Sequence, residues 1–263
     1  MAATLPILLP GENATARMAE ADSAASEGKV APRLRSFRDF YAFEQHVATC
    51  RAQRGQEMVP AWYEVPVFYF SNPDSLVGDG AEVCAPAECE ELDYELELGL
   101  VIGRAGRDIS VEEAWNHVLG FTIVNDLSAR DLQRREMKVG LGPAKGKDFA
   151  TAVGPRIVPL DSLRDRIGDD DRLDLEMVAR VDGQELSRGN ARSMYFSWSQ
   201  LIAHASRDAT LYPGDLLGSG TVGTGCILEL RPENTGGWLT PGRVVELEVE
   251  RLGTLTTHIV DRP

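Results

Sequence analysis

The chain has 263 residues, of which 43% are hydrophobic and 26% charged, and its formal net charge is −14. This length can bury a large core, and the composition is that of an ordinary soluble globular protein. The excess of acidic residues argues against nucleic acid and anionic membrane surfaces as partners, because no basic stripe is available to neutralise phosphates. It leaves carboxylates free to bind a hard cation.

Residues 1–35 are expected to form a flexible N-terminal arm, because positions 11–34 are rich in Ala, Glu and Ser without a sustained apolar period. The apolar run 5–10 is too short to span a bilayer, and no basic residue precedes Arg17 as a signal peptide would require. Four cysteines in this length do not suggest a disulfide framework. We therefore expect a cytoplasmic protein with reduced thiols.

The first predicted element is a helix over residues 36–55, where apolar and aromatic side chains recur at mixed helical spacing before Gly55. Such a helix would place Asp39 and His46 on one face, two turns apart. Strands are predicted over 65–70 and 93–103. A short helix is predicted over 110–120, opened by Ser110 and Glu113 at capping-box spacing.

The segment 120–133, GFTIVNDLSARDLQ, is the most informative part of the chain. Its apolar run 121–124 predicts a buried strand, and that strand ends in polar residues that include Asp126 and Arg130. A carboxylate at the end of a core strand costs several kcal/mol unless a cation or dense hydrogen bonding compensates it. Asp126 is therefore a candidate site residue.

The second half of the chain predicts further strands and one more helix. Residues 140–155 form a Gly/Pro-rich loop that carries Lys145 and Lys147. The Asp182-Gly183 pair predicts a hairpin turn. A helix is predicted near 197–206, followed by strands around 216–220, 226–230 and 244–252. Many strands with few short helices predict an α+β or mixed-β fold, without a repeat or a dividing linker.

Glu95 and Glu97 lie two residues apart in an apolar strand, so their carboxylates share one face. Two like charges this close favour a cation between them, and oxygen ligands suit Mg²⁺, Ca²⁺ or Mn²⁺. The same alternation recurs at Glu246, Glu248 and Glu250, where a strand with a solvated face is the simplest interpretation. By itself, the alternating pattern is therefore weak evidence for a metal site.

Several other motifs have ordinary structural explanations. Residues 218–223, GSGTVG, match a dinucleotide pattern, but the strand-like segment 226–230 follows where a helix would be needed, so a β-turn loop near a site is expected. His46 alone is more often a packed or surface residue, and the Lys147 loop lacks the glycine pattern of a phosphate-binding loop. No Gly-x-Ser-x-Gly motif supports a serine hydrolase.

Taken together, four ordered blocks resemble the fumarylacetoacetate hydrolase family from Ser36 to the C-terminus. They are DFYAFEQH (39–46), LDYELELGLVIG (92–103), NDLSARDLQ (125–133) and LGPAKGKDFAT (141–151). The histidine block is closest to that of fumarylacetoacetase, since His46 lacks the H-x-x-E pattern of the small acylpyruvase members. The resemblance implies a catalytic domain over 36–263, a mixed β-sandwich roll with a few short helices, and a homodimer.

The resemblance also implies roles for individual residues. The carboxylates that match metal ligands, for Mg²⁺ or Ca²⁺ with Mn²⁺ as an alternative, are Asp39, Glu95, Glu97 and Asp126. Lys147 and Thr151 match the positions beside the metal. His46 matches the catalytic histidine, oriented by Glu229. The substrate-facing positions are Tyr41, Tyr69, Arg130, Gln133, Thr221 and an arginine for the substrate carboxylate, Arg54 or Arg51, of which Arg54 is preferred.

The activity implied is metal-dependent hydrolysis of a carbon–carbon bond in a 1,3-diketo acid related to fumarylacetoacetate or an acylpyruvate. The cation would polarise a carbonyl as a Lewis acid, His46 would take a proton from water, and Lys147 would stabilise the oxyanion. One alternative is a decarboxylase, hydratase or isomerase of 2-oxo acids with the same metal site. Another is a non-catalytic binding protein, which would not need the Asp39, His46 and Glu229 set.

Overall fold

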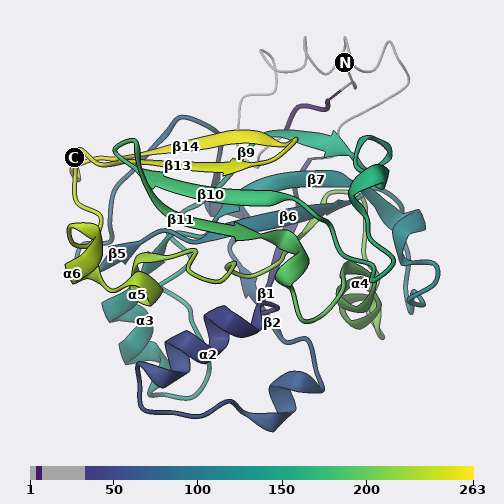
Figure 1. Ribbon diagram of the computed structural model, residues 1–263, viewed down its shortest axis with the longest axis horizontal. Coiled ribbons are helices and arrows are strands. Elements are labelled where there is room, and N and C mark those ends of the chain that lie inside the picture. The colour runs from purple at the N-terminus through teal and green to yellow at the C-terminus, as the bar shows by residue number, and fades with distance from the viewer. Residues whose placement is uncertain (1–3, 8–32) are drawn as a thin grey trace.

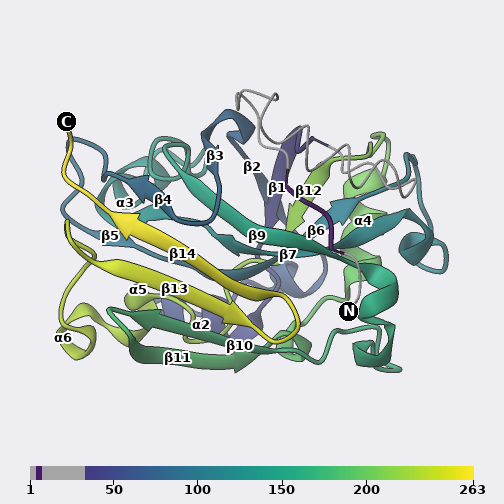
Figure 2. The same cartoon turned by 90° about the horizontal axis from the view of Figure 1, so that it is seen from above.

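Two β-sheets packed against each other form the body of the protein in the computed structural model, which describes residues 4–7 and 33–263 (Figure 1). One sheet has seven strands and the other five, and a two-stranded sheet joins β5 (Leu92–Asp93) to β8 (Ser128–Ala129). Seen from above, β14 of the smaller sheet runs beside β9 of the larger one (Figure 2). The predicted mixed-β class with few short helices is confirmed.

The seven-stranded sheet mixes parallel and antiparallel pairs. Its β1–β12 and β3–β9 pairs are parallel, and its remaining pairs are antiparallel. In spatial order its strands are β2 (Phe68–Ser71), β1 (Ser36–Phe40), β12 (Asp215–Gly218), β6 (Leu96–Ile102), β7 (Val118–Asn125), β9 (Thr151–Pro159) and β3 (Leu76–Val77).

The five-stranded sheet contains the predicted hairpin. In spatial order its strands are β11 (Gln184–Asn190), β10 (Glu176–Val181), β13 (Val244–Val249), β14 (Gly253–Ile259) and β4 (Ala81–Val83). Asp182 and Gly183 join β10 to β11 with φ of 51° and 75°, the positive values that a tight hairpin turn requires.

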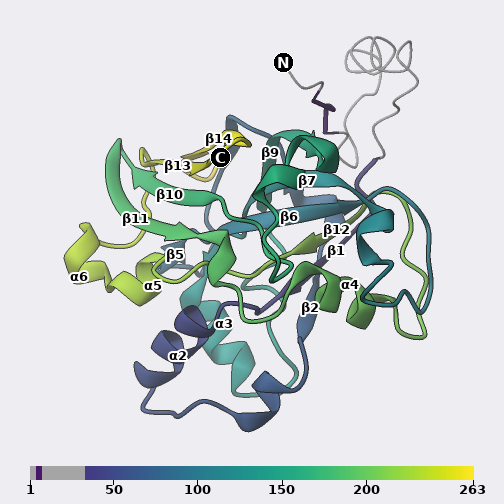
Figure 3. The ribbon, with the colours of Figure 1, turned by 45° about the vertical axis from the view of Figure 1, so that its right-hand side comes forward.

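Short helices lie around the sheets, and α2, α3 and α5 gather at one end (Figure 3). The predicted helix near 197–206 is α4, and Ser197 and Gln200 form a complete capping box at its start. None of the helices in the described ranges is long and apolar enough to cross a membrane. The α-helices are α2 (Glu44–Ala52), α3 (Arg130–Met137), α4 (Trp198–Ser206), α5 (Ile227–Leu230) and α6 (Pro232–Thr235). Single 3-10 turns occur at η1 (Pro60–Tyr63), η2 (Pro73–Ser75), η3 (Ala114–His117), η4 (Leu160–Ser162), η5 (Arg164–Arg166) and η6 (Ala191–Ser193).

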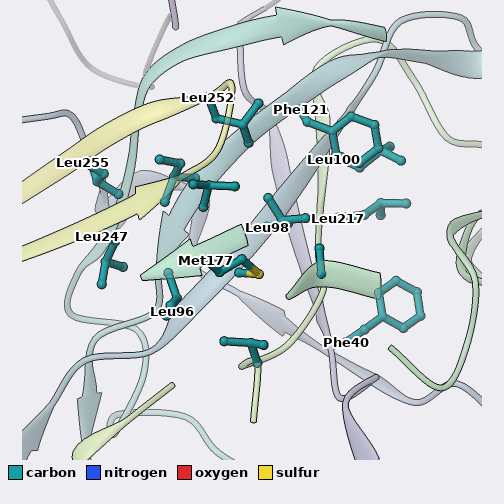
Figure 4. Close-up of a cluster of buried hydrophobic side chains, with 14 of the residues drawn as sticks. Phe40, Leu96, Leu98, Leu100, Phe121, Met177, Leu217, Leu247, Leu252 and Leu255 are labelled. Atoms are coloured by element: carbon teal, nitrogen blue, oxygen red, sulfur yellow. The ribbon is translucent and has the colours of Figure 1, made fainter. Parts of the chain in front are cut away.

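The main core lies between the two sheets. Along β6, the alternate residues Leu96, Leu98 and Leu100 are fully buried in one cluster with Met177 of β10 and Leu247 of β13 (Figure 4). Each buried leucine adds about 1.5–3 kcal/mol of hydrophobic stabilisation. Strict alternation along β6 therefore commits one face of the larger sheet to this core.

The opposite face of the seven-stranded sheet holds a second buried cluster, which includes Val101, Val124 and Val153. Leu5 and Ile7 cover it, and Leu5 exchanges two backbone hydrogen bonds with Ile157 of β9, at 3.0 and 2.9 Å. These two residues fall within the arm expected over 1–35, and positions 1–3 and 8–32 of that arm lie outside the described residues. The larger sheet is thus covered on both faces.

The helix predicted over 36–55 is wrong in its first part. Residues Ser36–Phe40 form β1, because β12 and β2 pair with this segment on either side and satisfy its backbone groups as a strand. Only Glu44–Ala52 is helical, as α2. Asp39 and His46 therefore lie on different elements rather than on one helical face.

Three other predicted elements also differ in the structure. The strand over 93–103 is divided into β5 and β6, and the loop predicted over 140–155 ends where β9 begins. The helix predicted over 110–120 shrinks to η3, because residues 118–120 pair with neighbouring strands as the start of β7. The strand around 226–230 is instead the one-turn helix α5. Its first N–H groups, on Ile227 and Leu228, donate to the carboxylate of Asp93 at 2.7 and 3.0 Å.

Candidate metal centre and active site

Three carboxylates from separate strands converge on the second face of the seven-stranded sheet. Asp39 comes from β1, Glu97 from β6, and Asp126 directly follows β7. One oxygen of each lies within 4.8 Å of the others, and all three side chains are buried. By strand alternation they lie on the same side as Val101 and Val124, so they continue the second core cluster at its polar end.

Glycines on the strand between β1 and β6 make room for this cluster. Gly218 of β12 pairs with Asp39 on one side and Gly99 on the other. A Cβ at Gly218 would come 2.2 Å from Asp39 Oδ1. The backbone N–H of Gly220 donates to the same oxygen at 3.2 Å. The GSGTVG segment is thus a loop at the site, as the sequence predicted.

Asp126 is surrounded by donors, as expected for a buried carboxylate. Tyr69 donates its hydroxyl, and the Lys147 ammonium forms an ion pair, both at Oδ2. Thr151 on β9 donates its hydroxyl to Oδ1 at 3.1 Å. Burial, followed by the charge of Asp126, raises the pKa of Tyr69 well above its ordinary value. Tyr69, Lys147 and Thr151 thus surround the Asp126 carboxylate.

Glu97 is less well satisfied. Thr221 donates its hydroxyl to Oε1 at 3.2 Å, and within the described residues the other oxygen, Oε2, is buried without a hydrogen-bond partner. Burial, and then the neighbouring Asp39 carboxylate, raises the pKa of Glu97 well above its ordinary value. For Asp39, burial followed by Asp126 raises the pKa in the same way. Around these two carboxylates, negative charge therefore exceeds the positive charge that Lys147 supplies.

The clustered groups fit a divalent cation. Three ionised carboxylates and the Lys147 ammonium sum to minus two (3 − 1 = 2 excess negative charges). The donors are all oxygen, which suits Mg²⁺, Ca²⁺ or Mn²⁺ rather than a soft metal. The unpartnered Glu97 oxygen points to the same conclusion, because a buried acceptor without a donor is costly unless an ion compensates it.

Glu95, expected as a fourth member, is held by cations of the protein. Its carboxylate accepts from Arg130 Nη2 at 2.8 Å and pairs with Lys147. Although burial alone would raise it, these two positive charges, Lys147 before Arg130, lower the pKa of Glu95. The three-residue cluster of Asp39, Glu97 and Asp126 does not include it.

Asp93 is a buried site residue that the sequence interpretation missed. It accepts from Arg130 Nε at 2.8 Å and caps α5, so it links two site elements. A signal was available, since acidic residues recur at 93, 95 and 97 in one alternation. Arg130 therefore pairs with Asp93 and Glu95 rather than with Asp126.

His46 and Glu229 form a buried pair that joins α2 to α5. Nδ1 of His46 donates to Glu229 Oε2 at 2.7 Å, and Glu229 Oε1 accepts from the N–H of Thr224 at 3.0 Å. Burial lowers the pKa of His46, but the carboxylate of Glu229 outweighs it and the net pKa lies well above the ordinary value. Nε2 lies 3.9 Å from Glu95 Oε1, so this nitrogen faces the carboxylate region.

His46 lines one cavity of about 1180 Å³ together with Asp39 and Glu97 of the carboxylate cluster. All the substrate-facing residues expected from the sequence line it: Tyr41, Arg54, Tyr69, Arg130, Gln133 and Thr221. Arg51, the alternative to Arg54, lines it as well. Sequence reasoning missed further lining residues, among them Phe68, Phe70, Arg134 and Lys138, because only the folded chain brings α3 and β2 to the same cavity.

Comparison with known proteins identifies the family and the fold. Residues 35–260 match the family model described as "Fumarylacetoacetate (FAA) hydrolase C-terminal". A fumarylacetoacetate hydrolase from psychrophilic Exiguobacterium antarcticum has a similar structure, with a TM-score of 0.70 and 28% identity over 88% of this chain and 78% of that one. The resemblance seen in the sequence and the fold it implies are confirmed.

Curated relatives carry more than one activity in their names. The human protein named oxaloacetate tautomerase FAHD2A, mitochondrial, is 35% identical over 197 residues, 74% of this chain. The chain spans 59% of that relative's length. A 2,4-didehydro-3-deoxy-L-rhamnonate hydrolase of Sphingomonas sp. is 37% identical over 192 residues, 72% of this chain and 63% of the relative.

Proposed function

This chain belongs to the fumarylacetoacetate hydrolase family, and from that premise we propose that it is a divalent-metal-dependent hydrolase of a carbon–carbon bond in a 1,3-diketo acid. The observation that carries the proposal is the buried His46–Glu229 pair, because His46 lines the same cavity as Asp39 and Glu97 of the carboxylate cluster. A purely binding protein would have no use for this pair beside a metal centre.

Asp39, Glu97 and Asp126 are the proposed holders of the cation, with Glu95 as the candidate fourth ligand. Lys147 and Thr151, which contact Asp126, border the site. When bound, Mg²⁺, Ca²⁺ or Mn²⁺ supplies Lewis-acid polarisation of a substrate carbonyl, worth several kcal/mol.

The residues of the chain supply the proton transfers and the positioning. Glu229 accepts from Nδ1 of His46, so Nε2 lies on the cavity side and can take a proton from water once it has released its own. The resulting hydroxide attacks the substrate carbonyl, and the Lys147 ammonium stabilises the negative charge on its oxygen. The carbon–carbon bond then breaks, the departing carbon is protonated, and a carboxylic acid and a second acid or keto acid are released. Because the pKa of His46 is raised, the hydrolysis rate should rise with pH until Nε2 of His46 is deprotonated.

Substrate recognition is assigned to the lining residues predicted from the sequence. The guanidinium group of Arg54, or of Arg51, suits a carboxylate of a diketo acid. Arg130 borders the same cavity while it pairs with Asp93 and Glu95. The polar side chains that accompany them are Tyr41, Tyr69, Gln133 and Thr221. Tyr41 also packs edge-on against His46, with 5.5 Å between ring centroids, and so helps to hold the proposed base in place.

The test replaces His46 and Asp126 singly with Ala and follows loss of the diketone absorbance on acylpyruvates and fumarylacetoacetate. Both variants should lose activity, but only Asp126→Ala should also lose thermal stabilisation by Mg²⁺ or Mn²⁺. If His46→Ala hydrolyses at the wild-type rate while Asp126→Ala is inactive, water activation by His46 is wrong.

A second candidate is isomerase or tautomerase chemistry on a 2-oxo acid, with decarboxylation or hydration as related outcomes. The 35% identical human relative named as an oxaloacetate tautomerase favours it. The same metal site would serve, with proton transfer in place of hydrolysis. Enol-to-keto conversion of oxaloacetate, measured beside the diketo acids, separates the two: conversion without any cleavage product on the diketo acids would favour the second candidate.

A further inference from the structure

Two buried thiols lie beside the His46–Glu229 pair. Cys226 Sγ is 3.5 Å from Glu229 Oε2 and 4.0 Å from His46 Nδ1. Cys50 Sγ, one helical turn after His46 on α2, is 3.9 Å from the same nitrogen. All four side chains are at most 8% exposed. Nitrogen, sulfur and oxygen ligand atoms thus surround one small volume.

The cluster has the composition of a zinc site. Zinc binds cysteine sulfur, histidine nitrogen and carboxylate oxygen tetrahedrally at about 2.0–2.3 Å, which places ligand atoms about 3.3–3.8 Å from one another. The separations found here run from 2.7 Å between His46 and Glu229 to 4.0 Å between His46 and Cys226. For His46, Cys226 and Glu229, whose ligand atoms all lie within 4.8 Å of one another, side-chain shifts of less than about 1 Å would give tetrahedral spacing. Cys50 Sγ lies 3.9 Å from both ring nitrogens of His46, so this side chain would have to turn toward the ion to become a fourth ligand.

The carboxylate cluster and the thiol cluster differ in chemical softness. Asp39, Glu97 and Asp126 offer only oxygen, which suits Mg²⁺. The thiol cluster of His46, Cys226 and Glu229, with Cys50 beside it, offers sulfur and an imidazole, which suit zinc. An ion can reach the thiol cluster through the cavity, since His46 and Cys50 line it. A small buried cysteine that only fills space would need no such polar neighbours.

We propose that Cys50, Cys226, His46 and Glu229 form an inhibitory zinc site, distinct from the hard-cation site at Asp39, Glu97 and Asp126. Zinc ligation by Nδ1 of His46 and by Glu229 separates the two members of the pair, so the imidazole loses the partner that holds it for proton transfer. The thiols release protons as zinc binds. Inhibition rests on the role proposed above for His46, whereas zinc binding does not.

Binding is tested first, on the full-length protein in excess Mg²⁺ with a phosphine reductant that keeps the thiols reduced. Cobalt(II) serves as the optical probe, because cobalt–thiolate bonds give a charge-transfer absorption that carboxylate ligands do not. One equivalent should produce this band, and Zn²⁺ should displace it. Cys226→Ser should weaken Zn²⁺ binding at least about tenfold, the lower end of what losing even an outer partner of a metal site costs.

Cys50→Ser provides a second variant with the same expected direction if Cys226→Ser does not fold. The matched control is the Cys84→Ser, Cys89→Ser double variant, which removes the two thiols that are only partly buried. It should keep the band. A band of equal strength without Cys226 and Cys50, or no thiolate band in the wild type, would overturn the site.

Inhibition is measured next, each variant being compared with its own zinc-free rate in saturating Mg²⁺. Wild type and the control should be inhibited alike, and Cys226→Ser should need at least about tenfold more Zn²⁺. Equal inhibition of Cys226→Ser would mean that zinc acts at the carboxylates by displacing Mg²⁺. If no diketo acid is hydrolysed, the proposed function fails, while the cobalt band still decides the zinc site.

Discussion

Glu97 on β6 and Glu248 on β13 belong to the same alternating pattern of glutamates in the sequence, but the first side chain is buried and the second is exposed. Glu97 on β6 is fully buried, and its Oε2 has no hydrogen-bond partner in the described chain. Glu248 on β13 is exposed and accepts from Arg180 at 2.7 Å, and Glu250 beyond it pairs with Arg166. β6 lies in the middle of a sheet covered on both faces, whereas one face of β13 meets solvent.

The energetic difference follows from this burial. An exposed pair such as Glu248–Arg180 contributes about 0–1 kcal/mol. A buried carboxylate without a partner costs several kcal/mol, so it persists where another charge or a function compensates it. An alternating acidic pattern therefore shows which side chains share one face of a strand. Whether that face forms a site depends on whether other parts of the chain bury it.

The largest expected effect is on the rate of the proposed reaction, which should distinguish Glu97 of β6 from Glu248 of β13. Glu97→Gln should lower the proposed hydrolysis rate at least about a thousandfold, because the loss of Lewis-acid chemistry is worth several kcal/mol. Glu248→Gln should stay within about twofold of wild type, as expected for an exposed ion pair. Initial rates in saturating Mg²⁺ measure both. Equal effects of the two substitutions would remove the distinction between the strands.

The second prediction concerns stability and its dependence on pH. Divalent cation at about 100 times its Kd should stabilise wild type by about 2.7 kcal/mol, and Glu97→Gln by much less. With a chelator present, wild type should lose stability as the pH rises above 4.5. The raised pKa of Glu97 means that the folded protein holds this proton longer than the unfolded chain. Glu97→Gln should flatten this loss, and denaturant titrations over pH measure it.

The third prediction compares Gly218 on β12 with Gly99 on β6. Gly218→Ala should weaken cation binding about tenfold, because the new methyl group would meet Asp39 Oδ1. Gly99→Ala would instead meet the apolar ends of Val124 and Leu216, at 2.7 and 2.9 Å. It should cost about 1–3 kcal/mol of stability and leave cation affinity unchanged. Calorimetric titration and thermal unfolding distinguish them, and a Gly218→Ala protein with wild-type affinity would contradict the role of this glycine.

The smallest expected effect tests the single hydrogen bond that Glu97 accepts from Thr221. Thr221→Val removes the hydroxyl that Glu97 accepts and should weaken cation binding about fivefold, or about 1 kcal/mol. Thr254 on β14, which lies opposite Glu248, is the matched exposed control, and Thr254→Val should leave the affinity for the cation unchanged. Calorimetric titration measures both affinities. Unchanged binding by Thr221→Val would show that this hydroxyl does not position Glu97.

The local sequence pattern was sufficient where the residues that stabilise an element are neighbours in the chain. The Asp182-Gly183 hairpin and the capped helix α4 were predicted from adjacent residues and are present. Pattern failed at α5, since that helix depends on Asp93, 134 residues earlier in the chain. It failed also at Ser36–Phe40, where pairing with β12, remote in sequence, overrode helical spacing.

The sequence by itself determined the alternation along β6, the glycines at 218 and 220, and the strand that delivers Asp126, because each depends on neighbouring residues along one element. Only the tertiary structure decided which alternating face is closed, that Asp93 and Glu95 share Arg130, and that His46 meets Glu229 across 183 residues. Contacts of that separation depend on how whole sheets pack, and strand periodicity carries no information about that packing.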